Sequence, residues 1–117
     1  MAAATFRLET AAGELVTPRV RVASGFGPRF LGLMGRASLP EDEGLCIQRC
    51  SQIHMFFMRF ALDVAFVNGD GQVLHVLHAI RPWRISRIVF GAKAAIELPA
   101  GTLARHGVTK GTVLKLV

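Results

Sequence analysis

Residues 62–80 read LDVAFVNGDGQVLHVLHAI, and this stretch decides the fold that we predict. Successive side chains of a β-strand point to opposite faces, so residues 62–67 place Val64 and Phe66 on one face and Asp63 on the other. Residues 68–71 (NGDG) follow, and these residue types tolerate the positive φ angles of a tight turn. Residues 72–80 are the returning strand, so the whole stretch predicts a β-hairpin.

Shorter apolar segments on both sides of the hairpin predict further strands. We expect them at residues 5–8, 15–22, 45–49, 92–98 and 112–116, with residues 102–111 as a connection that could include a turn of helix. Pro28 suits the first position of a helix, which predicts one short α-helix near residues 28–37. Roughly seven or eight short strands with frequent turns predict a mainly β fold, a small barrel-like or sandwich-like single domain.

Chain length and apolar runs limit the class of protein. A chain of 117 residues fits one domain, residues 1–117, with a core that needs no disulfide or metal. Its apolar runs are far shorter than the roughly 20 residues that cross a bilayer, so no membrane span is predicted. The N-terminal apolar run stops at Phe6 and Arg7 follows, unlike a secretory signal, so we expect a cytoplasmic protein.

Basic residues are in excess, with a net charge of +6. Residues 81–87 (RPWRISR) combine three arginines with Trp83, the only tryptophan, and such a loop could stack on a base or bind a phosphate. In the alternative interpretation, Trp83 folds over the mouth of the barrel and the arginines face solvent. The sequence contains no RNA- or DNA-binding motif, so nucleic-acid binding is kept as an alternative.

Soft metal-ligand types recur every four residues at Cys46, Cys50, His54 and Met58. Four-residue spacing brings ligands together on a helix, whereas a strand spreads them apart, so no metal and no cofactor is predicted. On one strand the two cysteines would lie roughly 13 Å apart, too far for a disulfide, and we expect free, packed thiols.

Residues 29–36 read RFLGLMGR, residues 62–66 LDVAF and residues 97–101 ELPAG. In this order they resemble the RxxGLMxR, LDxxF and ELPAG boxes of the domain of unknown function 192 family of bacterial and archaeal proteins. The resemblance implies a compact, mainly β, barrel-like sandwich with residues 56–59 in a central strand, and it implies no known activity. Many relatives carry export or anchoring segments. The usual tryptophan and Met-Lys-Asn-Thr of the central strand are replaced here by residues 57–61 (FMRFA).

Asp63 and Glu97 are the candidate catalytic groups. A carboxyl in apolar surroundings has a raised pKa and can act as an acid or base. Alternatively, Asp63 forms a structural ion pair with an arginine or hydrogen bonds to a turn, and Glu97 caps the turn at residues 99–101. Arg29 and Arg36 would lie two turns apart on one helix face, where they could hold an anion or clamp both carboxylates.

These residues predict a non-enzymatic ligand-binding or accessory domain. Its polar site would involve Arg29, Arg36, Asp63, Glu97 and Trp83, and its partner would be a small anionic or polar molecule or a protein segment. One alternative is a small hydrolytic or carbohydrate-directed enzyme that uses Asp63 and Glu97 as paired carboxylates. The second alternative is nucleic-acid binding through the basic surface.

Overall fold

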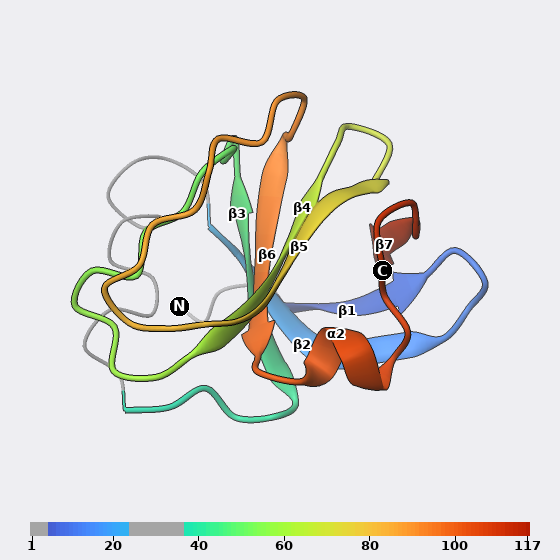
Figure 1. Ribbon diagram of the computed structural model, residues 1–117. Helices are drawn as coiled ribbons and strands as arrows, with labels where there is room; N and C mark the ends of the chain where they lie inside the picture. The colour runs from blue at the N-terminus through green and yellow to red at the C-terminus, as the bar shows by residue number, and fades with distance from the viewer. Residues whose placement is uncertain (1–4, 24–36) are drawn as a thin grey trace.

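A seven-stranded mixed sheet dominates the computed structural model, which describes residues 5–23 and 37–117 (Figure 1). The elements are β1 (Thr5–Thr10), β2 (Leu15–Ala23), β3 (Glu43–Gln48), β4 (Leu62–Val67), β5 (Val73–Ile80), β6 (Ala94–Pro99), α2 (Thr102–Arg105) and β7 (Leu114–Leu116). The mainly β prediction is confirmed. The helix predicted at residues 28–37 falls, except for Ala37, outside the described residues. Within the described residues, α2 is the one short helix. No helix in those ranges has the length and apolarity to span a membrane.

The sheet is open rather than closed into a barrel. Its order is β5-β4-β6-β3-β2-β1-β7, and only β2 and β3 pair in parallel. The two edges approach at one end, where Gln72 and Val113 form an isolated bridge. Gly71 permits this approach, because it has a φ of +80° and an added Cβ would lie 2.2 Å from the Leu114 carbonyl oxygen.

β4 lies between β5 and β6, and its two faces bury two different clusters. On one face, Val64 and Phe66 pack with side chains of the connections 49–61 and 81–93, and we call this the loop face. On the other, Ala65 and Val67 pack in a cluster that contains Leu103 of α2, and we call this the helix face. Figure 1 shows the two connections, in green and orange, running side by side.

The central strand predicted around residues 56–59 is wrong, because residues 49–61 form an irregular loop between β3 and β4. Arg49 (φ 56°) and Phe57 (φ 63°) leave the extended region of the backbone. The loop's backbone bonds to residues 81–93 instead of to the sheet, for instance from the Ser86 N–H to the Ile53 oxygen at 2.9 Å. Aromatic composition favoured a strand, and this loop-to-loop pairing overrides that preference.

Candidate functional site

Asp63 is fully buried on the helix face of β4. Its Oδ1 accepts a hydrogen bond from the Ala79 N–H and its Oδ2 accepts one from the Leu103 N–H, both at 2.9 Å. Ala79 (φ 50°) lies in a bulge of β5, and Leu103 lies in the first turn of α2. The carboxyl therefore fastens the bulge and the helix to β4. Of the predicted alternatives, hydrogen bonding to backbone is the one present, and no ion pair joins Asp63 to an arginine of the described residues.

Glu97 lies on β6 directly opposite Val64 of β4 and Leu45 of β3, so its side chain belongs to the loop face. It is buried, and burial raises the pKa of its carboxyl to about 7. No described residue forms a hydrogen bond or an ion pair with the carboxyl, so the predicted cap on the turn at residues 99–101 is not formed. Glu97 is therefore a buried titratable group whose cross-strand neighbours, Leu45 and Val64, are apolar.

The two carboxyls lie on opposite faces of the sheet. Asp63 pairs with Leu98, and Val64 pairs with Glu97, so Glu97 shares the face of Val64. Because side chains alternate along a strand, the two acids point away from each other. The structure therefore does not bring them to a common reaction centre. Arg29 and Arg36 lie outside the described residues, and their contact with either carboxyl stays a prediction.

The cysteines also fall in different layers. Cys46 belongs to the helix-face cluster and Cys50 to the loop-face cluster, and both are buried and form no disulfide. Burial, and secondarily the charge of Cys50, raises the pKa of the Cys46 thiol to about 11. Of the other soft ligand types, His54 stacks on Phe56 with ring centroids 4.7 Å apart, and Met58 is buried in the loop face. Within the described ranges, no three His, Cys, Asp or Glu residues are grouped to hold a metal.

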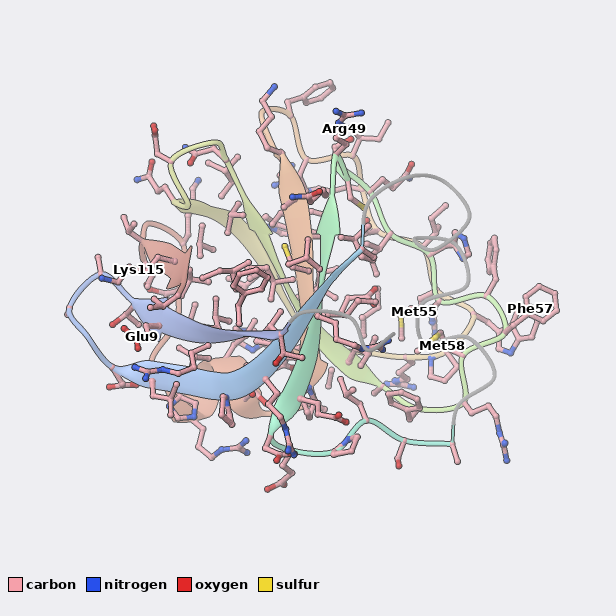
Figure 2. The ribbon with its side chains drawn as sticks, turned by 180° about the vertical axis from the view of Figure 1, so that it is seen from behind. Glu9, Arg49, Met55, Phe57, Met58 and Lys115 are labelled. Atoms are coloured by element: carbon pink, nitrogen blue, oxygen red, sulfur yellow. The ribbon has the colours of Figure 1, made fainter. Side chains whose placement is uncertain are left out.

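Trp83 is held by a pair of hydrogen bonds between the two loops. The Trp83 backbone N–H donates to the Met55 backbone oxygen at 2.7 Å, and the Met55 backbone N–H donates to the Arg84 backbone oxygen at 2.7 Å. We call these two hydrogen bonds at Met55 the clasp. Met55 is fully buried, whereas Phe57 points away from the sheet (Figure 2). The two loops that the clasp joins expose a group of side chains that we call the aromatic–arginine surface: Phe56, Phe57, Arg59, Arg81, Trp83, Arg84, Ile85 and Arg87.

The rings of this surface contact one another. Trp83 lies 5.0 Å from Phe57 and 6.1 Å from Phe56 between ring centroids. Both Phe57 (φ 63°) and Trp83 (φ 70°) have left-handed backbone conformations, which are uncommon for bulky residues. Sequence reasoning found Trp83 and its arginines but missed the phenylalanines, because it assigned them to a core strand. The signal was available, since the consecutive Phe56 and Phe57 cannot both face one side of a strand.

A separate cavity of about 320 Å³ opens on the helix face. Its apolar wall includes Leu8, Ile96 and Leu114, and the hairpin turn 68–71 contributes to its lining. Sequence reasoning did not predict this cavity, because its wall combines β1, β6 and β7, which are distant in the chain.

Comparisons with known proteins place the chain among uncharacterised relatives. Residues 7–116 match the family model DUF192, described as Uncharacterized ACR. A UPF0127 protein of Pyrococcus furiosus is 32% identical over 115 residues, which cover 92% of this chain and 95% of that protein. A UPF0127 protein of Thermococcus sibiricus is 36% identical over 99 residues, covering 78% of this chain but only 61% of that protein, so the match spans less than two thirds of it.

Two crystal structures share the fold. One is that of a putative transcription regulator from Sinorhizobium meliloti 1021, with a TM-score of 0.84 and 26% identity over 99% of this chain and 96% of that one. The other is a protein of unknown function from Novosphingobium aromaticivorans, with a TM-score of 0.81 and 22% identity over 95% of this chain and 83% of that one.

Proposed function

We propose, from the premise that this chain belongs to the DUF192 family of uncharacterised proteins, that it is a non-enzymatic binding domain for an anionic partner. The observation that carries the proposal is the aromatic–arginine surface. Residues 49–61 and 81–93, which build it, contain no Asp or Glu. Binding sites commonly combine such exposed aromatic side chains with arginines.

The arginines of this surface favour an anionic partner over a neutral one. Arg59, Arg81, Arg84 and Arg87 are exposed, and none has an ion pair with a described residue. Each guanidinium therefore keeps its donors for a phosphate or carboxylate, to which arginine binds through two parallel hydrogen bonds. Of the predicted ligand-binding residues, Trp83 belongs to this surface, and the other four belong to the layers beneath it or to residues 24–36.

The position of Asp63 argues for binding rather than for paired-carboxylate catalysis. Each of its oxygens accepts a hydrogen bond from a backbone N–H, so the carboxyl is committed to the fold. The remaining enzyme alternative would use Glu97 alone as a general acid or base, although its carboxyl is buried on the loop face. Turnover of chromogenic glycosides or esters that disappears in Glu97→Gln would favour that alternative over the binding domain.

Trp83 provides the test, because it is the only tryptophan and lies in the surface. Titration with inorganic polyphosphate is expected to change its fluorescence emission, with an affinity that falls as salt is added. Arg84→Ala is expected to weaken binding. Arg105→Ala, which removes the same charge from α2, is expected to leave it unchanged. Unchanged emission together with no binding by calorimetry would overturn the proposal, and so would equal losses in the two variants.

Nucleic-acid binding is the second candidate, and it gains support from the fold of the putative transcription regulator of Sinorhizobium meliloti. It would require bases to add affinity beyond that of their phosphates. Oligothymidylate that binds more tightly than polyphosphate of the same length would favour this candidate.

A further inference from the structure

We propose that the aromatic–arginine surface docks peripherally on an anionic phospholipid bilayer, an inference that rests on the proposed function and names the class of its partner. The two loops, residues 49–61 and 81–93, would make the contact with the bilayer. Four features of the surface carry this inference: its apolar side chains, its charge, its rigidity and the arrangement of its rings.

The exposed apolar side chains suit a hydrocarbon partner. Phe57, Trp83 and Ile85 are 60%, 59% and 60% exposed, a large apolar area to leave in water. Ile88 and Phe90, further along the same loop, are also exposed. Phenylalanine and isoleucine partition into hydrocarbon, and tryptophan favours the interface between headgroups and water. The mixture of aromatic and aliphatic groups therefore matches the outer zone of a bilayer.

Charge selects an anionic bilayer over a neutral one. Residues 49–61 and 81–93 carry five arginines and one lysine, and no acid opposes them within the two loops. Basic residues near a membrane surface are attracted to anionic lipids, with a gain of about fivefold in affinity for each residue. A guanidinium also matches the geometry of a lipid phosphate. The arginines would thus lie in the headgroup layer while the rings enter below it.

The rings are presented rigidly. The clasp at Met55 fixes the loops against each other, and Phe57 and Trp83 hold positive φ angles that cost free energy in bulky residues. Both strained residues are exposed aromatics in mutual contact, so the strain serves to display rings rather than to fill the core. A surface ordered in advance loses less conformational entropy on binding.

The arrangement of the rings disfavours single-stranded nucleic acid as the partner. Stacking platforms need ring faces free for successive bases. Here Trp83 is tilted by 60° against Phe57 and by 35° against Phe56, so the rings pack as one cluster. Ile85, which faces solvent beside them, has no π face to offer a base. A hydrocarbon layer accepts such a cluster whatever its ring angles.

The test uses vesicles of phosphatidylcholine alone and of phosphatidylcholine mixed with phosphatidylserine, measured by co-sedimentation and by Trp83 emission. We expect binding and a blue shift with the mixed vesicles, and at least tenfold weaker binding to the neutral ones. Arg84→Ala should lower binding about fivefold, while Arg105→Ala, with the same charge change on the opposite face of the sheet, should leave it within twofold.

Phe57→Gly separates membrane insertion from folding. Glycine accepts the φ of 63° without strain, so the variant should keep its melting temperature while losing binding by at least tenfold. Ile85→Ser, which shortens an exposed side chain, is the second variant if Phe57→Gly does not fold, and it should lose binding severalfold.

Each outcome decides the inference. Loss of vesicle binding in Phe57→Gly and Arg84→Ala, with Arg105→Ala unaffected, supports it. Equal binding to neutral and anionic vesicles overturns the proposal of an anionic bilayer. Tight binding to oligothymidylate without vesicle binding overturns that proposal in favour of nucleic acid. Binding to polyphosphate but not to vesicles overturns the bilayer while leaving the proposed function intact. Binding to none of these overturns both.

Discussion

Replacing Glu97 by glutamine is expected to stabilise the protein at neutral pH and above. The side chain is buried on the loop face between Leu45 and Val64, and no described residue forms an ion pair with it. Burial penalises the charged form of the carboxyl, which raises its pKa from an ordinary 4.5 to about 7. Glutamine has nearly the same shape and no charge to bury.

The size of the effect follows from the two pKa values. Below about pH 4.5, Glu97 is protonated in both the folded and the unfolded chain, and its favourable contribution is fully present. As the pH rises to about 7, the unfolded chain ionises while the folded chain still holds its proton, so the free energy of unfolding falls. One pKa unit is about 1.4 kcal/mol, so the total loss is about 3 kcal/mol, and it is constant above pH 7.

Urea denaturation followed by circular dichroism measures this directly at several pH values. The difference in unfolding free energy between Glu97→Gln and the parent protein should grow by about 3 kcal/mol between acidic and alkaline pH. Glu41→Gln removes the same charge from an exposed loop position and is the matched control. A difference that stays constant with pH, or that appears equally in Glu41→Gln, would refute the assignment of Glu97 as a buried carboxyl that costs stability when ionised.

Three further expectations test other parts of the structure. Asp63→Ala should destabilise the fold by about 2–5 kcal/mol, because the buried Leu103 N–H and the partly buried Ala79 N–H both lose their acceptor. Asp42→Ala, which removes only an exposed ion pair, should cost less than about 1 kcal/mol. Equal losses in denaturation would contradict the buried role of Asp63. Gly71→Ala should lower the melting temperature more than Gly13→Ala, since both residues have positive φ but only at Gly71 would a Cβ overlap another backbone; similar losses would count against the close approach of the sheet edges. In a Cys50→Ala variant, Cys46 should be alkylated far more slowly in the folded than in the unfolded protein near neutral pH, because the thiol is buried and burial alone still raises its pKa. Rapid labelling of the folded protein would disagree with this burial.

Most of the strands were predictable because their signals are local. The alternation in residues 62–67 and the turn at residues 68–71 lie within one hairpin, and β4 and β5 form there. The loop at residues 49–61 was not predictable in the same way. Its apolar and aromatic residues resemble a strand, but its backbone partners lie some thirty residues downstream in the loop 81–93, roughly the span of Ile53 to Ser86.

For the candidate site, too, local features were predictable and contacts between distant segments were not. The sequence by itself determined that Asp63 shares a strand face with Ala65 and Val67, because side chains alternate within one strand. It also identified Trp83 among arginines as a candidate binding group. Only the tertiary structure decided that Asp63 and Glu97 face opposite layers, because that depends on the register between β4 and β6. A shift of one residue would place both carboxyls on one face, and register is set by contacts between strands that are distant in the chain.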